Sequence, residues 1–265
     1  MLYAPAEIPS FAQNLPIKIR GVCENVGVLK PEQYLSSIER DAGAFAIALQ
    51  AGVLDLEIAA CPGWTLEQLG RHLGGVHRWA AATLESGVSG QVPEGPADGD
   101  KLATWFIDGA DELLAALRSS DPAASTWTFG PHPQRTSFWF RRQAHETAMH
   151  LFDAHRAMGI GTEFDVALAA DGIDEVCTIL FPRQVRLGRT RALQQGVSLV
   201  LLDGPATKHV IAGDGNDPNA DADAILFGSA QRLLLALWGR GGIEGLEVQG
   251  DPDVVRRILG SGLTA

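Results

Sequence analysis

The chain has 265 residues, of which 46% are hydrophobic and 20% charged, as in an ordinary folded protein. This length allows one large domain or two modest ones with real hydrophobic cores, and it excludes a disulfide-stabilised miniprotein. The formal net charge is -11, so the surface as a whole repels nucleic-acid phosphates and anionic lipid headgroups. We therefore expect neither a nucleic-acid partner nor a membrane partner.

The N-terminal 30 residues contain three prolines and lack the apolar stretch of about 7–15 residues that a secretory signal needs. No apolar run in the chain approaches the roughly 18 residues of a transmembrane helix. These features predict a cytoplasmic protein with an extended N-terminal arm, residues 1–30. The cysteines Cys23, Cys61 and Cys177 have no CxxC spacing, which favours buried, reduced thiols over disulfides or cysteine-bound zinc.

The next 130 residues predict four amphipathic helices. Apolar residues recur at three- and four-residue steps over residues 31–53, 66–84, 102–117 and 137–158. The second helix has a complete start signal, because Thr65 can cap it and Gln68 stands at the capping-box position. The fourth helix ends at Gly159, which suits the left-handed conformation at a helix C-terminus. Four such helices indicate a helix bundle over residues 31–163.

The pattern changes after this bundle, and strands enter it. We expect, in chain order, a helix over 165–181, strands at 197–202 and 208–212, a long helix over 221–238, a strand at 246–249 and a last helix capped by Asp251. Residues 164–265 therefore predict a second, small α+β domain.

The fourth predicted helix contains a cluster of possible metal ligands, His145, Glu146 and His150. The two histidines are five residues apart and diverge by about 140° around a helix, so they cannot bind one ion together. Glu146 and His150 are four residues apart and can offer an oxygen and a nitrogen to the same metal. Such a pair alone is usually a solvated helix face, so a third ligand is needed.

The second predicted helix offers His72 and His77 as the third ligand, and at most one of them can face the bundle interior. His72 lies beside the apolar stripe of the helix, whereas His77 adjoins Arg78 and is expected to face solvent. A core histidine bonded to a backbone carbonyl is the plainer interpretation of His72.

Two segments carry a resemblance to a known family. They are CPGWTLEQLGRHLGGVHRW at residues 61–79 and FWFRRQAHETAMHLFDA at residues 138–154. In them the chain resembles the mycothiol-dependent maleylpyruvate isomerase-like family of actinobacterial proteins, which belongs to the DinB-like metal-binding bundles. The segments LLALWGR at 234–240 and VQGD at 248–251 extend the resemblance to that family's C-terminal domain, so that it covers roughly residues 31–265.

This resemblance implies an α plus α/β two-domain fold, with an N-terminal DinB-like four-helix bundle followed by a small α+β, sterol-carrier-like domain. It implies a divalent metal, usually zinc, held by His72, Glu146 and His150. It also implies that Arg240 reaches a substrate carboxylate, with a solvated arginine at a helix end as the alternative. Mycothiol is the cosubstrate that the resemblance implies.

The expected function is that of a metal-dependent transferase or isomerase. A low-molecular-weight thiol would be the nucleophile on a small electrophilic substrate, and isomerisation, S-transfer and metal-assisted hydrolysis all remain open. The alternative is a non-enzymatic protein that binds a small ligand, with the metal structural or absent. Asp153 could orient a metal ligand or form a surface ion pair. Cys61 precedes a helix N-terminus, which could lower its pKa.

Overall fold

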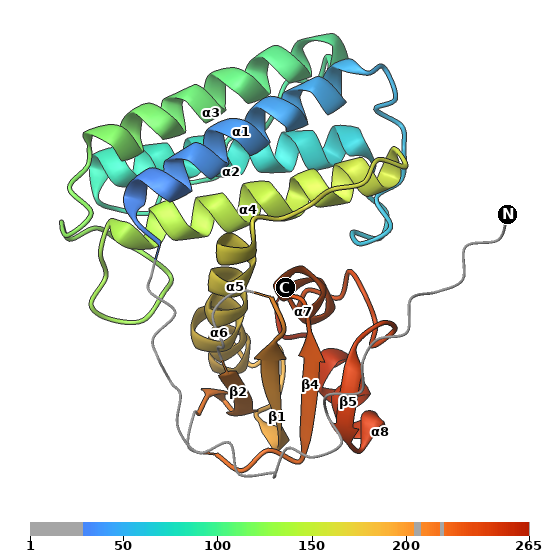
Figure 1. Ribbon diagram of the computed structural model, residues 1–265. Coiled ribbons are helices and arrows are strands. Elements are labelled where there is room, and N and C mark those ends of the chain that lie inside the picture. Colours follow the sequence, from blue (N-terminus) through green and yellow to red (C-terminus); the bar gives the residue numbers. More distant parts are fainter. Residues whose placement is uncertain (1–28, 204–207, 218–219, 265) are drawn as a thin grey trace, which may run out of the picture.

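The computed structural model describes residues 29–203, 208–217 and 220–264. Nearly all of the predicted N-terminal arm, including Cys23, lies outside this part of the chain. Figure 1 shows two stacked parts, a group of long helices and below it a sheet with its own helices. In the described ranges, no helix is long and apolar enough to cross a membrane.

The four predicted helices of the bundle are all present. They are α1 (Pro31–Gln50), α2 (Leu66–Ser86), α3 (Leu102–Ser119) and α4 (Ser137–Ala157). The capping box forms as predicted, because the backbone N–H of Thr65 donates to Oε1 of Gln68 at 2.6 Å. Gly159 has the expected left-handed backbone, with φ of 72°. A short 3-10 turn, Gly99–Lys101, leads into α3.

The second part of the chain builds a mixed sheet covered by helices. Its first helical stretch runs through three consecutive segments, α5 (Val166–Glu175), a π-helical turn (Val176–Leu180) and α6 (Phe181–Arg186). The other elements are β1 (Leu193–Leu201), β2 (Lys208–Gly213), β3 (Gly215–Asn216), β4 (Ala224–Gly228), α7 (Ala230–Leu237), β5 (Glu247–Gly250) and α8 (Pro252–Leu259). The sheet order is β3-β2-β1-β4-β5, in which β1 and β4 are parallel and the other neighbours antiparallel.

The predicted long helix over 221–238 is wrong in its first half. Residues Ala224–Gly228 form β4, which lies between β1 and β5 in the sheet, and only Ala230–Leu237 are helical. A short apolar run has no helical or strand period of its own, so pairing with β1 decides its conformation. Ser229 then caps α7, because its side chain accepts a hydrogen bond from the backbone N–H of Arg232. The fold class predicted from the sequence, a helix bundle followed by a small α+β domain, is confirmed.

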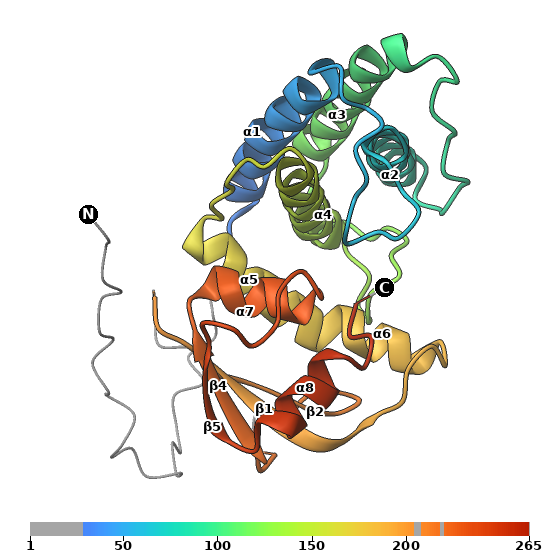
Figure 2. The same cartoon turned by 90° about the vertical axis from the view of Figure 1, so that its right-hand side faces the viewer.

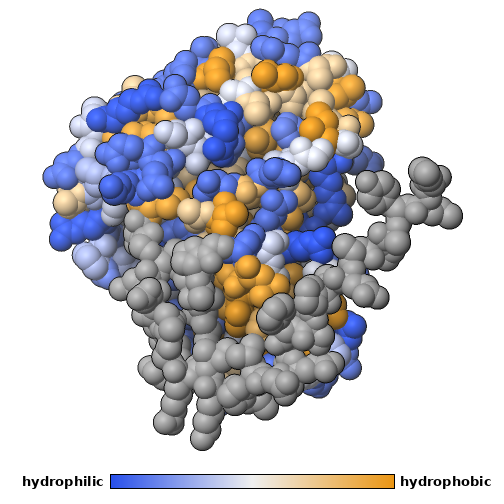
Figure 3. All heavy atoms as spheres, viewed as in Figure 1, coloured by the Kyte–Doolittle hydropathy of each residue, from blue (hydrophilic) through white to orange (hydrophobic). Residues whose placement is uncertain are grey.

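The helices of the second part lie where they join the two halves. Figure 2 shows α5, α6 and α7 between the bundle and the sheet. A buried polar cluster ties α5 to the bundle: Asp171 accepts hydrogen bonds from Tyr34 at 2.9 Å and from Nε of Arg141 at 2.9 Å. In the view of Figure 3, hydrophilic side chains cover much of the left side of the bundle, apolar side chains gather at its upper right, and a further apolar patch lies below the bundle.

Candidate metal centre

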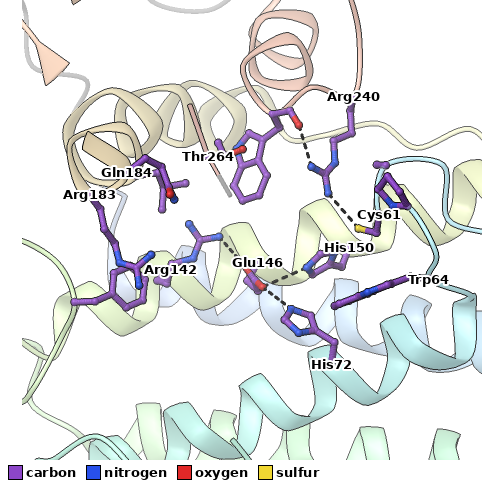
Figure 4. Close-up of a pocket in the computed structure, with 15 residues that line it drawn as sticks. Cys61, Trp64, His72, Arg142, Glu146, His150, Arg183, Gln184, Arg240 and Thr264 are labelled. Atoms are coloured by element: carbon purple, nitrogen blue, oxygen red, sulfur yellow. Dashed lines mark hydrogen bonds and ion pairs between the residues drawn. The ribbon is translucent and has the colours of Figure 1, made fainter. Parts of the chain in front are cut away.

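Three side chains from two helices converge on one point between α2 and α4. Oε1 of Glu146 lies 3.3 Å from Nε2 of His72 and 3.2 Å from Nε2 of His150. The three potential ligand atoms all lie within 4.8 Å of one another. Figure 4 shows the three side chains pointing toward one another, with His72 on α2 and the other two on α4. The structure therefore brings together the three candidate ligands that the sequence analysis named.

The chemistry of this triad suits a divalent metal. Two imidazole nitrogens and one carboxylate oxygen form a donor set found in catalytic zinc sites, which leave a coordination position open. The outer partners are also present, since Nδ1 of His150 lies 3.2 Å from Oδ2 of Asp153 and Oε2 of Glu146 accepts from Arg142 at 2.9 Å. A carboxylate on the second nitrogen of a ligating histidine fixes the ring's orientation. The residues therefore fit a metal such as zinc.

The same contacts shift the pKa values of the ligands. Burial alone lowers the pKa of His150, but hydrogen bonds to Asp153 and Glu146 outweigh it and raise that pKa to about 9. Burial alone raises the pKa of Glu146, but its hydrogen bonds to His150 and His72 hold it well below its usual value. Without a metal, Glu146 is thus negatively charged and His150 positively charged at neutral pH. Metal binding must therefore release the proton from His150.

The other two histidines of these helices lie elsewhere. Nε2 of His145 lies 2.7 Å from Oδ2 of Asp171, in the buried cluster between bundle and α5. The expectation that His77 faces solvent is wrong, because His77 is fully buried and its Nε2 lies 2.9 Å from Oγ1 of Thr147. Burial lowers the pKa of His77 to about 3. His72 is the more exposed of the two because its side of α2 lines a cavity.

Arg240 approaches the triad from the loop after α7. Its Nε and Nη2 donate to the two oxygens of Asp153 at 3.1 and 2.8 Å. Both side chains are buried, so the alternatives of a solvated arginine and a surface ion pair are wrong. Asp153 thus connects Arg240 of the second domain to His150 of the bundle.

Cys61 lies next to this arginine, with its Sγ 3.9 Å from Nη2 of Arg240. Its position before a helix does not lower its pKa. Burial, and then the charge of Asp153, raise the pKa of the Cys61 thiol. Cys61 and the buried Cys177 are both free thiols, as predicted.

The triad opens into a cavity of about 460 Å³ between the two domains. The bundle contributes the three ligands, and the second domain contributes side chains from α6, from the end of α7 and from the C-terminal segment. Besides the triad, the cavity is lined by Ala60, Cys61, Pro62, Trp64, Phe129, Arg142, Leu180, Arg183, Gln184, Trp238, Arg240 and Thr264.

Both parts of the chain match domains of one known protein family. Residues 35–155 match the mycothiol maleylpyruvate isomerase N-terminal domain, and residues 167–257 match the MDMPI C-terminal domain, so the two matches span most of the chain in the expected order. The protein belongs to the mycothiol-dependent maleylpyruvate isomerase family. No protein with a curated description gives a significant match.

Two solved structures share the fold. The crystal structure of the mycothiol-dependent maleylpyruvate isomerase is 15% identical, with a TM-score of 0.59 over 84% of this chain and 95% of that chain. A histidine-to-alanine mutant of the mycothiol-dependent maleylpyruvate isomerase is 14% identical, with a TM-score of 0.60 and the same coverage. At this identity the likeness concerns the fold.

Several cavity residues of this member of the isomerase family were not singled out from the sequence. Arg142 could have been found, because it lies one helical turn before Glu146 and its Nη2 reaches that carboxylate. Arg183, Gln184 and Thr264 carry no sequence signal, since only the packing of α6 and the C-terminal segment against the bundle brings them to the cavity.

Proposed function

We propose that the protein is a metal- and thiol-dependent cis–trans isomerase of a small electrophile, with mycothiol as the thiol. One observation carries the proposal: an open set of two histidines and a glutamate faces a cavity of about 460 Å³ that both domains enclose. Membership in the mycothiol-dependent maleylpyruvate isomerase family supports mycothiol as the first thiol, and maleylpyruvate as the first substrate, to test.

His72, Glu146 and His150 would hold the metal, and zinc is the first candidate for this donor set. When bound, such a cation supplies the Lewis acidity that makes a thiol ionise near neutral pH. Asp153 holds the ring of His150 in place, and Arg142 holds Glu146 from its other oxygen. The ligand side chains are therefore already oriented by the protein.

The nucleophile in this proposal comes from outside the protein. Burial raises the pKa of Cys177 far above its usual value, and burial also raises that of Cys61. In the part of the chain that the structure describes, neither cysteine is poised to act as a thiolate. A small thiol that enters the cavity beside the triad would fill this role.

The chemistry is a reversible addition. The thiolate sulfur forms a bond to one carbon of an activated cis double bond, and the electron pair of that bond moves onto the activating carbonyl. Rotation about the resulting single bond, followed by return of the electron pair and departure of the thiolate, gives the trans isomer. The thiol is regenerated. Trp238 and Leu180 line the cavity and would keep water from the adduct.

Arg240 remains our candidate for a residue that faces the substrate. Its guanidinium lines the cavity near the triad, which supports this role. Because Asp153 holds two of its nitrogens, Arg240 would also act as a positioning residue for Asp153 and, through it, for His150.

The reaction can be tested with purified, zinc-loaded protein. We expect loss of the cis substrate and gain of the trans product from maleylpyruvate only when mycothiol is present, with no net consumption of mycothiol. Consumption of one mycothiol per substrate would instead indicate S-transfer. Conversion without any thiol, or no conversion of a panel of activated cis alkenes, would contradict the proposal.

Thiol binding can be followed separately in cobalt-loaded protein. Titration with mycothiol should produce a thiolate-to-cobalt charge-transfer band and release a proton. The band should be absent from the Glu146→Ala variant and unchanged in Cys61→Ser. If no cellular thiol produces the band while cobalt stays bound, the thiol-dependent function is wrong, and a ligand-binding role or hydrolysis takes its place.

A further inference from the structure

One end of the cavity, formed by Arg183, Gln184 and Thr264, presents polar groups that the protein itself does not use. We name these three residues the α6 end of the cavity, since α6 carries two of them. Gln184 is 3% exposed and Thr264 is 6% exposed. Within the described ranges, none of the three side chains has a hydrogen bond or an ion pair, although all three line the cavity. The guanidinium carbon of Arg183 lies over the ring of Phe129, 4.7 Å from the ring centroid.

Polar groups that line a cavity and have no partner within the protein are free to form hydrogen bonds with a bound molecule or with water. Gln184 and Thr264 are largely buried, and both side chains line the cavity. The α6 end therefore offers unpaired hydrogen-bonding groups to whatever occupies the cavity.

The charges of the cavity point to the kind of ligand. Arg142 is paired with Glu175 and with Glu146, and Arg240 is paired with Asp153, so the positive charges of these two arginines are balanced within the protein. Arg183 alone among the three cavity arginines has no carboxylate partner in the described residues. Arg240 can still contact a substrate, but among these three arginines only Arg183 has a positive charge that no carboxylate of the described residues balances.

The residues around Arg183 add to the excess of positive charge at this end of the cavity. Burial, and then the positive charges of Arg189 and Arg186, lower its pKa below the usual value for arginine. The guanidinium still remains charged at neutral pH, because an arginine pKa starts above 12. An anion at this end would relieve the repulsion among these cations.

The hydrogen-bond donors at the α6 end favour a carboxylate over other anions. A guanidinium offers two parallel N–H groups that match the two oxygens of a carboxylate, and the amide of Gln184 and the hydroxyl of Thr264 add neutral hydrogen bonds. One guanidinium balances one negative charge, whereas a phosphate dianion would leave a charge uncompensated beside the apolar Phe129 and Leu180. Figure 4 shows Arg142 between Arg183 and Glu146, so the α6 end lies apart from the triad.

We propose that the α6 end binds a carboxylate of the electrophilic substrate and that Arg183 thereby restricts the enzyme to anionic electrophiles. The reaction of this substrate rests on the proposed function, whereas the binding of its carboxylate to Arg183 does not. The substrate would span the cavity, with its carboxylate on Arg183 and its double bond beside the triad.

Binding of unreactive probes tests the proposal without thiol and without turnover. Monomethyl succinate carries one carboxylate, dimethyl succinate carries none, and neither has a double bond for a thiol to attack. In titrations of the full, zinc-loaded chain followed by calorimetry or NMR, the monoester should bind at least tenfold more tightly than the diester. Arg183→Gln should remove that difference, and Arg183→Lys should keep part of it, because lysine retains the charge without the fork.

Arg189→Gln is the matched control, because it removes the same charge from an exposed neighbouring residue that does not line the cavity. It should leave the preference for the monoester within about twofold, since a screened surface charge contributes little. Equal binding of both probes, or an unchanged preference in Arg183→Gln, would overturn the proposal. Inorganic phosphate binding more tightly than the monoester, and depending on Arg183, would overturn the assignment to a carboxylate.

If isomerase activity is found, a kinetic split adds a second readout. Arg183→Gln should raise KM for an anionic substrate about tenfold or more and change kcat by less, because binding of the carboxylate is similar in substrate and transition state. Failure of the proposed function would appear as missing thiol-dependent turnover with intact probe binding. Failure of this inference would appear as turnover whose KM is insensitive to Arg183→Gln.

Discussion

At the scale of single residues, the candidate centre is organised around one carboxylate. Oε1 of Glu146 lies between Nε2 of His72 and Nε2 of His150, and Oε2 is held by Arg142. Each ligand therefore has a second contact or a neighbouring ligand that restricts its rotamer, which is what a preorganised metal site requires. The i, i+4 spacing of Glu146 and His150 made this pair visible in the sequence.

The ligand set can be tested by substitution. His72→Ala, Glu146→Ala and His150→Ala should each abolish stoichiometric zinc binding, because each removes one of only three protein ligands. His145→Ala and His77→Ala should retain zinc, since those rings contact Asp171 and Thr147 instead. Zinc content after dialysis is the measurement, made on samples whose circular dichroism shows a folded protein. Loss of zinc from a folded His145→Ala variant would contradict the prediction that His145 points away from the metal site on α4.

At the scale of elements, the position of α2 depends on how closely α3 can approach it. Gly74 of α2 faces the ring of Trp105 of α3, and a Cβ at Gly74 would collide with that ring. Gly74 lies two residues from His72, so the close contact with α3 is made in the part of α2 that carries the histidine. The helical periodicity of both segments predicted the two helices, but not the distance between them.

Two glycine substitutions separate packing from helix propensity. Gly74→Ala should lower the free energy of unfolding by about 1–3 kcal/mol, because the methyl group overpacks the contact between the helices. Gly43→Ala should instead raise it by about 0.5–1 kcal/mol, since Gly43 lies within α1 and a Cβ there meets no atom within 4 Å. Urea denaturation of both variants is the measurement. A stabilising Gly74→Ala would show that the two helices can separate at little cost.

At the scale of the whole molecule, the cavity exists because two domains meet. The bundle supplies the triad, and the second domain supplies Arg240, Trp238 and the α6 end. Several polar contacts join the two halves, among them the pair of Arg240 with Asp153, the pair of Arg142 with Glu175 and the cluster around Asp171.

Removal of the metal should affect function far more than folding. The bundle has its own apolar core around Phe45, Leu73 and Phe106, so three ligands contribute little to its stability. Treatment with a chelator should abolish thiol-dependent turnover and lower the melting temperature by only a few degrees. Calorimetry with and without zinc is the measurement. Global unfolding at room temperature in the chelator would mean that the metal is structural.

The cluster between the domains should make stability sensitive to acid. Burial alone raises the pKa of Asp171, but the hydrogen bond from His145 and the charges of His145 and Arg141 outweigh it and lower that pKa below the ordinary 3.8. A carboxyl whose pKa is lower in the folded state stabilises it fully above the unfolded value, and this contribution is lost as the pH falls through the folded value.

The Asp171→Asn variant checks this linkage. At neutral pH it should be less stable than the wild type by on the order of 3 kcal/mol, because Arg141 loses a buried partner. Below pH 3.8 the difference should shrink as Asp171 of the wild type becomes protonated. Denaturation at a series of pH values measures both effects. A difference that stays constant down to the lowest pH would contradict the assignment.

The sequence by itself determined the four helices of the bundle, the two-part organisation and the ligand pair on α4. These features depend on periodicity and on spacing within one helix, which local geometry sets. It missed β4 because a five-residue apolar run has no period of its own, and its pairing with β1 comes from a segment more than twenty residues away.

Only the tertiary structure decided which of the two histidines on α2 is buried. His77 packs beside Phe106 of α3 and Thr147 of α4, whereas His72 lines the cavity, and that choice depends on which face of α2 packs into the bundle. The same docking places Arg183 and Gln184 beside a site that their neighbours in sequence do not reveal. Burial and charge balance are properties of the assembled molecule, because they depend on contacts between residues distant in the chain.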